Sequence, residues 1–197
     1  MRNNNSPAYE FCTGTEAIMN KNELRARMRA LARERTDGER ETASRTIFGR
    51  IARLDDFTRA RCVALYCALP DEPDTREALE EWSRTRRLVV PRVEGDVMNF
   101  CDYDPATLAA GAFGIAEPGP HAQPCPPGEI DLVIVPGMAF TRSGVRLGRG
   151  RGYYDRYLAR PSLHARTIGV CFAGSLVDAI PAEPHDIRMD RVISDEM

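Results

Sequence analysis

Lysine is almost absent from this sequence. Of the 27 basic residues only Lys21 is a lysine, and the other 26 are arginine. A chain with this bias keeps a lysine either by chance or where a compact ammonium is required. An ammonium is a point charge that can follow a moving phosphoryl group, whereas a guanidinium is a rigid planar fork. Lys21 is therefore a candidate functional residue that needs support from elsewhere in the chain.

Histidine is also scarce, and cysteine never occurs in a CxxC pair. The three histidines are far apart in the chain, which argues against a histidine-rich metal site. Several of the six cysteines lie inside apolar runs such as VALYCAL and IGVCF. We therefore expect buried, reduced thiols.

Long apolar runs and an excess of positive charge are missing too. No run approaches the length of a membrane span, and the first residues, MRNNNSPAYEFCTGT, lack the apolar block of a signal peptide. The net charge of -2 and the pI near 6.0 argue against a general nucleic-acid binder. We expect a cytoplasmic protein without a membrane or nucleic-acid partner.

The length of 197 residues, with 43% hydrophobic residues, suits one globular domain. Residues 1–18 are polar and aperiodic, and we expect them to form a poorly ordered extension before a single catalytic domain at 19–197. Translation could start at Met1 or at Met19. The proline-rich segment 117–129 could be a linker, but its shortness favours a surface loop.

Helical and strand-like segments alternate along the domain. Short, continuously apolar strands separated by helices predict a three-layer α/β/α domain with a mostly parallel sheet. We expect helices that begin at Asn20 and that span 37–54, 75–86 and 153–160, with a further short helix near Leu176. Strands are expected at 62–69, 88–93, 97–103, 131–137, 167–172 and 191–194. A loop is expected between the strand at 97–103 and Gly128.

The first helix carries the lone lysine. Apolar residues recur at helical spacing from residue 24, Asn20 suits the N-cap, and Glu23 stands at the capping-box position. Lys21 and Arg25 then lie one turn apart on the same side.

The stretch RLGRGRGYYDR, at 146–156, is rich in both glycine and arginine. Its glycines let the backbone approach a ligand closely, and its arginines reverse the local charge of an acidic chain, which suits a phosphate chain. It matches neither the P-loop nor the GxGxxG pattern. A flexible loop of solvated arginines remains an alternative. RNA binding is another, with Tyr153 and Tyr154 stacking on bases.

Three acidic residues are further candidates. Asp155 and Asp186 could hold Mg2+ through oxygen ligands, although a salt bridge to arginine is the commoner role of such acids. Glu72 lies just past the end of a predicted strand, where parallel sheets place ligand contacts. Asp71 and Asp74 suit a turn or a helix cap equally well.

Several motifs, in order along the chain, resemble the 5-formyltetrahydrofolate cyclo-ligase (5,10-methenyltetrahydrofolate synthetase) family. The resemblance runs from about Lys21 to Glu196, and the RLGxGxGYYD element is its most specific part. The motifs are NKNELR (20–25), YCALPDE (66–72), VPRV (90–93), GIAEP (114–118), VPGMAFTRSGVRLGRGRGYYDRYL (135–158) and IPAEPHD (180–186).

The resemblance implies a domain similar to sugar-phosphate isomerases and CoA transferases, and an enzyme that uses ATP and Mg2+ to cyclise 5-formyltetrahydrofolate. We expect the protein to be a monomer. By resemblance Lys21 and Arg146 would be catalytic. ATP would contact Lys21, Asn22, Glu23, Leu24, Arg25, Arg146, Leu147, Gly148, Arg149, Gly150, Arg151, Gly152, Tyr153 and Tyr154. The folate would contact Arg25, Cys67, Glu72, Arg149, Gly150, Arg151, Gly152 and Tyr153, and the metal would be held by Asp155 and Asp186.

The chain departs from the family pattern at Thr141, where aspartate is common, and at Ser175, where glutamine is common. Neither residue is among the implied ligands, so these departures concern the shape of the pocket more than the reaction. Two rival functions stay open at this point. One is a non-catalytic RNA- or nucleotide-binding module, and the other is a sugar-phosphate or acyl-CoA enzyme with the same fold.

Overall fold

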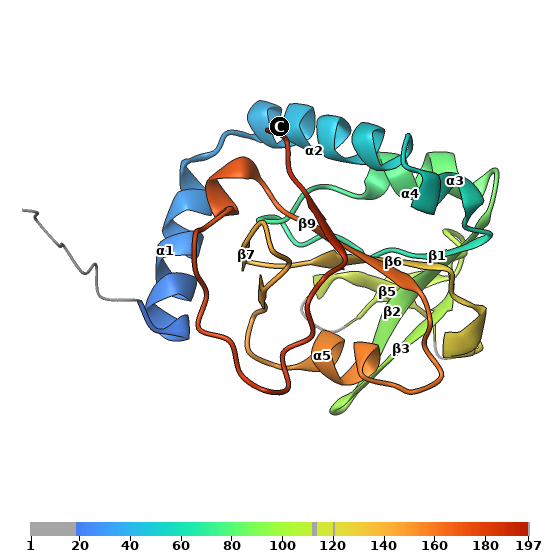
Figure 1. Ribbon diagram of the computed structural model, residues 1–197. Helices are drawn as coiled ribbons and strands as arrows, with labels where there is room; N and C mark the ends of the chain where they lie inside the picture. The colour runs from blue at the N-terminus through green and yellow to red at the C-terminus, as the bar shows by residue number, and fades with distance from the viewer. Residues whose placement is uncertain (1–18, 112–113, 120, 197) are drawn as a thin grey trace, which may run out of the picture.

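A twisted six-stranded sheet forms the centre of the computed structural model, which describes residues 19–111, 114–119 and 121–196 (Figure 1). Its strand order is β10-β9-β6-β1-β2-β3, and every neighbouring pair is parallel except β2 and β3. The strands are β1 (Cys62–Ala64), β2 (Arg87–Glu94), β3 (Val97–Asp102), β6 (Leu132–Pro136), β9 (Arg166–Val170) and β10 (Arg191–Ile193). The predicted mostly parallel sheet is confirmed.

Helices cover both faces of this sheet. In Figure 1, α2, α3 and α4 lie above it, α5 lies below it, and α1 stands at its end. The helices are α1 (Lys21–Glu34), α2 (Asp37–Ile51), α3 (Asp55–Arg59), α4 (Arg76–Ser83) and α5 (Tyr153–Leu158). No helix in the described part of the chain is long and apolar enough to cross a membrane.

Alternate residues of the central strands pack into two separate hydrophobic cores, one on each face of the sheet. Val63 and Ile134 pack with α2 and α4, whereas Ala64 and Val133 pack with Tyr157 of α5. The register places Val63 opposite both Leu88 and Leu132. Because side chains alternate between the two faces of a strand, a fully apolar run is required here, as expected for a three-layer fold.

A third cluster of buried residues attaches α1 to the sheet. Leu24 and Met28 of α1 pack against Met138, Val145 and Leu147, which follow β6 in the chain. Asn20 caps α1: its side-chain oxygen accepts bonds from the backbone of Asn22 and Glu23, and the Glu23 carboxylate accepts from the Asn20 amide at 2.9 Å. The predicted capping box is confirmed.

Short elements were the hardest to predict. The predicted strand at 62–69 ends at Ala64. The predicted helix at 37–54 ends at Ile51, and the separate helix α3 follows it. The predicted short helix near Leu176 is a 3-10 turn, η3 (Ala173–Ser175). The predicted loop before Gly128 contains two paired strands, and another hairpin precedes the glycine-rich stretch. The missed elements are β4 (Leu108–Ala110), β5 (Ala116–Pro118), η2 (Pro127–Glu129), β7 (Ala139–Phe140) and β8 (Arg146–Leu147). Elements of two or three residues carry no detectable periodicity.

The predicted extension at 1–18 lies outside the described residues.

We predict that Ile134→Ala lowers the free energy of unfolding by about 2–5 kcal/mol, because Ile134 is fully buried at the centre of β6 and its loss leaves a cavity. Urea denaturation followed by circular dichroism measures this change. Thr42→Ala, on the exposed face of α2, is the matched control and should shift stability by no more than about 0.5 kcal/mol. Equal stability of the two variants would contradict the assignment of Ile134 to the core.

Candidate active site

A cavity of about 510 Å3, which we call the main cavity, lies at the carboxyl ends of the parallel strands and is lined by most of the predicted site residues. Such strand ends are where open parallel sheets bind ligands. The start of α1, the segment after β1, the glycine-rich turn and the loop before β10 converge on it. The predicted site residues that line it are Lys21, Arg25, Cys67, Glu72, Arg146, Leu147, Gly148, Arg149, Gly150, Arg151, Gly152, Tyr153, Tyr154, Asp155 and Asp186.

Arg25 joins the two ends of the predicted ATP site. Its Nε donates to the carbonyl oxygen of Gly148 at 2.9 Å, across 123 residues of sequence. Its Nη1 donates to the side-chain oxygen of Asn22 at 2.8 Å. The first helix is thereby fastened to the glycine turn, which we define as residues 148–152.

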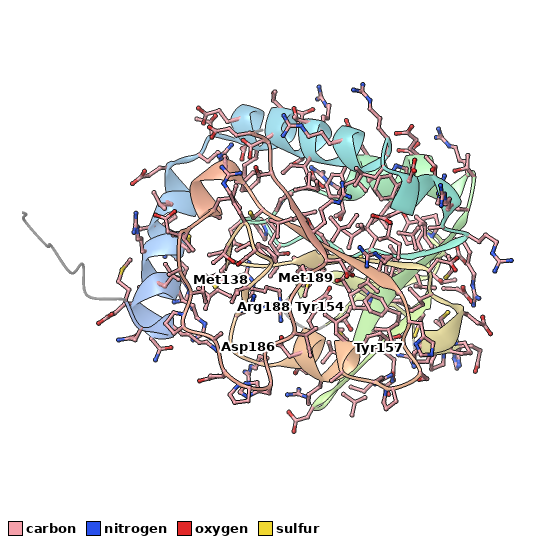
Figure 2. The ribbon with its side chains drawn as sticks, in the orientation of Figure 1. Met138, Tyr154, Tyr157, Asp186, Arg188 and Met189 are labelled. Atoms are coloured by element: carbon pink, nitrogen blue, oxygen red, sulfur yellow. The ribbon has the colours of Figure 1, made fainter. Side chains whose placement is uncertain are left out.

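Lys21 is held between two carboxylates of the loop before β10. Its Nζ lies 2.8 Å from Asp186 Oδ2 and 2.9 Å from Glu183 Oε2. Partial burial opposes the charge, but the hydrogen bonds to Asp186 and Glu183 outweigh it and raise the pKa of Lys21. The loop that carries Asp186 passes between α1 and α5 (Figures 1 and 2). The lone lysine is thus charged and directed into the cavity.

Glu183 was missed by the sequence reasoning, although it belongs to the IPAEPHD motif. Ligand atoms of Glu183, His185 and Asp186 all lie within 4.8 Å of one another, close enough to hold one metal ion. Burial opposes the ionisation of Asp186, yet its hydrogen bonds to Lys21 and to the Glu183 amide lower the pKa of its carboxyl group. The sequence did contain a signal for Glu183: it lies three residues before Asp186, at a turn.

Positive φ angles shape the glycine turn. Gly150 has a φ of 98°, and Gly152, which caps α5, has a φ of 68°. At Gly152 an added Cβ would also meet Arg156 Nη1 at 2.8 Å. Side-chain-bearing residues rarely adopt this backbone, so the glycines are required by the shape of the turn.

Arg146 is buried below the turn and pairs with a predicted metal ligand. Its Nη2 donates to Asp155 Oδ2 at 2.8 Å, and its Nη1 donates to the Pro136 carbonyl at 3.3 Å. The remaining Asp155 oxygen accepts a long bond, 3.5 Å, from the Ile187 amide. The Arg146 guanidinium lies over the ring of Tyr154, 5.4 Å from its centroid. The metal-binding role of Asp155 stays a prediction. A metal ion at Asp155 would share its carboxylate with Arg146.

Arg149 closes the other side of the cavity. Its guanidinium pairs with Asp71 and lies 3.0 Å from Glu72 Oε1. Glu72 is 8% exposed, and burial raises the pKa of its carboxyl group despite the charge of Arg149. Nearby, burial raises the pKa of the half-buried Cys67 thiol to about 11. Asp71, for which the sequence suggested a turn or a cap, is a partner of Arg149.

Three predicted ATP contacts do not line the cavity. Asn22 binds Arg25, Glu23 belongs to the capping box, and Leu24 is buried against the hairpin of β7 and β8. Their contacts with ATP remain predictions. All three lie on the helix that positions Lys21 and Arg25, so their evident role here is to place those cations.

The apolar wall of the cavity was also missed. Most of its members lie in family motifs and one lies in a predicted strand, but none was predicted as a site residue, and they meet only in the folded chain. They are Tyr66, Pro91, Val93, Met98 and Ile115.

The two departures from the family pattern lie in different places. Thr141 is buried in the turn of the β7–β8 hairpin, where its hydroxyl accepts from the Val145 amide at 3.1 Å and bonds the Ser143 hydroxyl at 2.9 Å. Ser175 lines a second, smaller cavity. Neither side chain touches the main cavity.

Comparison with known proteins shows which family the chain resembles. The model of the 5-formyltetrahydrofolate cyclo-ligase family matches residues 17–195. The 5-formyltetrahydrofolate cyclo-ligase of Mycolicibacterium smegmatis is 34% identical over 182 residues, which cover 88% of this chain and 93% of that protein. The mouse enzyme is 26% identical, with 88% of this chain and 91% of that protein covered.

Solved structures agree as well. The solution structure of 5,10-methenyltetrahydrofolate synthetase from Aquifex aeolicus superposes with a TM-score of 0.82 at 32% identity and covers 91% of each chain. The synthetase from Mycoplasma pneumoniae gives a TM-score of 0.74 at 26% identity, covering 90% of this chain and 100% of that one. The chain belongs to the 5-formyltetrahydrofolate cyclo-ligase family.

Proposed function

We propose that the protein catalyses the ATP-dependent cyclisation of 5-formyltetrahydrofolate to 5,10-methenyltetrahydrofolate, with release of ADP and phosphate. One observation carries the proposal: Lys21 and Arg25 from the first helix meet the glycine turn and Glu72 around a single cavity. A cavity of about 510 Å3 with an apolar wall and several cations fits a flat heterocycle together with a phosphate group.

The chemistry explains why cations are needed and a nucleophilic side chain is not. The N5 formyl group is an amide, and its oxygen leaves poorly. Transfer of the γ-phosphoryl group of ATP to that oxygen gives an imidate phosphate. N10 then attacks the formyl carbon and loses its proton, and phosphate departs with the electrons of the carbon–oxygen bond. Phosphoryl transfer requires mainly positioning and charge neutralisation from the protein.

Each cation of the cavity has a role in this scheme. Lys21 would move from Glu183 and Asp186 onto the phosphate as charge develops there. Arg146 and the amides of the glycine turn would hold the phosphate chain, because their positions are supported by buried contacts. Glu72 and Cys67, beside the apolar wall, would contact the folate.

Carboxylates at the same cavity fit a magnesium ion. Asp155 and Asp186 both line it, each engages one cation through Oδ2, and oxygen donors are what Mg2+ prefers. Glu183 and His185 have ligand atoms within 4.8 Å of that of Asp186, so Glu183 would add an oxygen ligand to an ion held by Asp186. When bound, Mg2+ would neutralise phosphate charge and hold the triphosphate in a reactive orientation.

The cations are arranged unlike an exposed nucleic-acid surface. Arg146 and Arg149 face the cavity and pair with Asp155, Asp71 and Glu72. This pairing supports a small anionic ligand over RNA, which would require a solvent-facing basic patch.

We predict that Lys21→Arg lowers turnover by about two to three orders of magnitude, because a planar guanidinium cannot follow the phosphoryl group as an ammonium does. The measurement is the ATP-dependent rise in absorbance of the methenyl product, together with ADP release. Arg29→Lys, at an exposed position of the same helix, is the control and should keep full activity. Wild-type turnover in Lys21→Arg with an unchanged urea midpoint would refute the role of Lys21.

Asp155→Asn should raise the Mg2+ concentration needed for half-maximal activity, since a neutral amide is a weaker ligand for a hard cation. A magnesium titration of the steady-state rate checks this. Asp55→Asn, on the exposed start of α3, provides the control for loss of one carboxylate. An identical titration curve for Asp155→Asn and the wild type would remove Asp155 from the metal site.

Cys67 should be alkylated slowly near neutral pH, because its pKa of about 11 leaves little thiolate there. The rate should rise with pH and show no plateau below about pH 11. Saturating 5-formyltetrahydrofolate should slow the labelling, since Cys67 lines the proposed folate pocket. Peptide mass spectrometry after iodoacetamide treatment gives both rates. Labelling of Cys67 at the same rate with and without the folate would contradict this assignment.

A further inference from the structure

Two motifs of the sequence, VPRV (90–93) and GIAEP (114–118), have no role in the reaction described above, yet they meet in the structure. VPRV lies on β2, and GIAEP includes β5. Arg92 Nη1 donates to the carbonyl oxygens of Gly119 and Ala122, at 3.1 and 2.7 Å, and thereby fastens the chain after β5 to β2. The residues of the two motifs that line the main cavity are Pro91, Val93, Ile115, Ala116 and Glu117.

Glu117 brings a carboxylate to the apolar wall of the main cavity. Its Oε2 accepts a hydrogen bond from the Val93 amide at 3.3 Å. The side chain lies against Gly111, where an added Cβ would overlap it, so the glycine leaves the space that Glu117 occupies. Burial and, after it, the charge of Glu117 raise the pKa of the Cys67 thiol, which places the carboxylate near Cys67.

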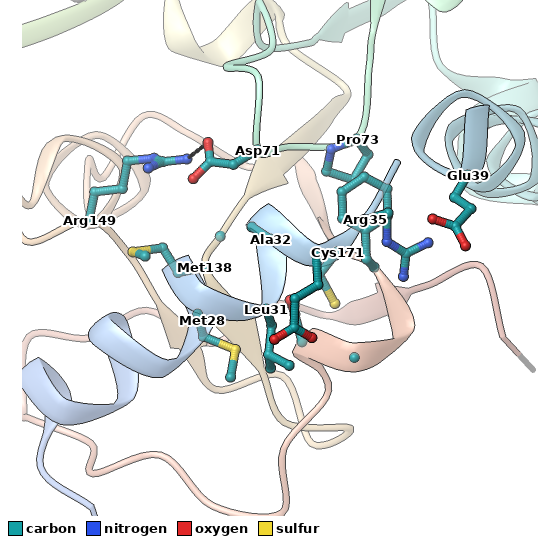
Figure 3. Close-up of a pocket in the computed structure, with 15 residues that line it drawn as sticks. Met28, Leu31, Ala32, Arg35, Glu39, Asp71, Pro73, Met138, Arg149 and Cys171 are labelled. Carbon is teal, nitrogen blue, oxygen red and sulfur yellow. Dashed lines mark hydrogen bonds and ion pairs between the residues drawn. The ribbon is translucent and has the colours of Figure 1, made fainter. Parts of the chain in front are cut away.

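The other acids of the main cavity each have a cation as partner. Glu72 pairs with Arg149, which also pairs with Asp71 and lines a second, smaller cavity (Figure 3). The remaining pairs are Asp155 with Arg146, and Asp186 and Glu183 with Lys21.

Glu117 has no such cation among the residues that the structure describes. The long bond from the Val93 amide is the one hydrogen bond that the carboxylate accepts from them. Each carboxylate oxygen has two lone pairs, so most of the acceptor capacity of Glu117 is free. A half-buried charge without donors is costly, and a ligand that brings N–H groups would remove this cost.

We propose that Glu117 determines which heterocycle the main cavity accepts, by receiving two neighbouring N–H donors from the ring edge of the substrate. This inference rests on the proposed function. 5-Formyltetrahydrofolate carries a 2-amino group beside a ring N3–H, and a carboxylate can accept two such parallel donors. The apolar side chains of Val93, Met98 and Ile115 would cover the faces of the same ring.

An anchor at this edge leaves the reacting atoms free. The 2-amino group and N3 belong to one ring of the bicycle, whereas N5, which carries the formyl group, belongs to the other. Glu117 would therefore hold the substrate without touching the formyl oxygen, and its loss should act on binding more than on the chemical step.

The test compares 5-formyltetrahydrofolate with its 2-desamino analogue, which lacks one of the two donors. Isothermal titration calorimetry of the full-length protein, without ATP, gives both affinities. Wild-type protein should prefer 5-formyltetrahydrofolate by about ten- to a hundredfold, because the analogue leaves a charged acceptor with one donor fewer. Glu117→Gln should weaken the binding of 5-formyltetrahydrofolate by a similar factor and should lose most of this preference.

Steady-state kinetics separates a binding role from a purely structural one. In Glu117→Gln the KM for 5-formyltetrahydrofolate should rise by about ten- to a hundredfold, while kcat and the KM for ATP stay as in the wild type. Glu81→Gln, at an exposed position of α4 outside the main cavity, is the control for loss of one carboxylate and should match the wild type throughout. Glu117→Ala removes both acceptor oxygens and keeps the test decisive if Glu117→Gln misfolds.

Unchanged affinity for 5-formyltetrahydrofolate in folded Glu117→Gln and Glu117→Ala would overturn the inference. Equal weakening of both compounds, with the preference between them kept, would overturn it too, because Glu117 would then only support the wall. Failure of the proposed function is distinguishable. A wild-type protein that bound 5-formyltetrahydrofolate with the expected preference but formed no methenyl product would refute the function and leave the role of Glu117 standing, whereas absence of folate binding would overturn both.

Discussion

The attachment of α1 to the glycine turn is the constraint on which the site depends. The bond from Arg25 to the Gly148 carbonyl, at 2.9 Å, is backed by the packing of Leu24 and Met28 against the hairpin of β7 and β8. Apolar burial supplies the free energy that holds the helix there, and the polar contact sets its orientation. Without this attachment Lys21 would lie outside the cavity.

The cations of the cavity are paired with carboxylates. Lys21 pairs with Asp186, Arg146 with Asp155, and Arg149 with Asp71. Such pairing keeps partly buried charges tolerable and holds them in place, so little reorganisation is needed when phosphate charge develops. In the proposed function, a polyphosphate or a metal ion would exchange with one partner of each pair.

Recognition of the fold from sequence succeeded where the elements are long or strongly apolar. The runs at 132–136 and 166–170 are buried on both faces and gave clear signals, whereas the paired strands at 108–110 and 116–118 are too short to show a period. The chain beyond Ala64 was predicted as strand because it stays apolar to Leu69. In the structure it leaves the sheet to bring Cys67 and Glu72 to the cavity, as expected where a ligand pocket interrupts a regular element.

The sequence alone was enough to predict the parallel α/β class, the capped first helix, and the glycine-rich and arginine-rich segment that lines the cavity, because each of these has a local sequence pattern. It could not show that Glu183 shares Lys21 with Asp186, that Arg149 divides two cavities, or that Val93 and Ile115 join one apolar wall. Those features arise between segments far apart in the chain. Their distances are set by packing of the two cores and of α1, which no local pattern encodes.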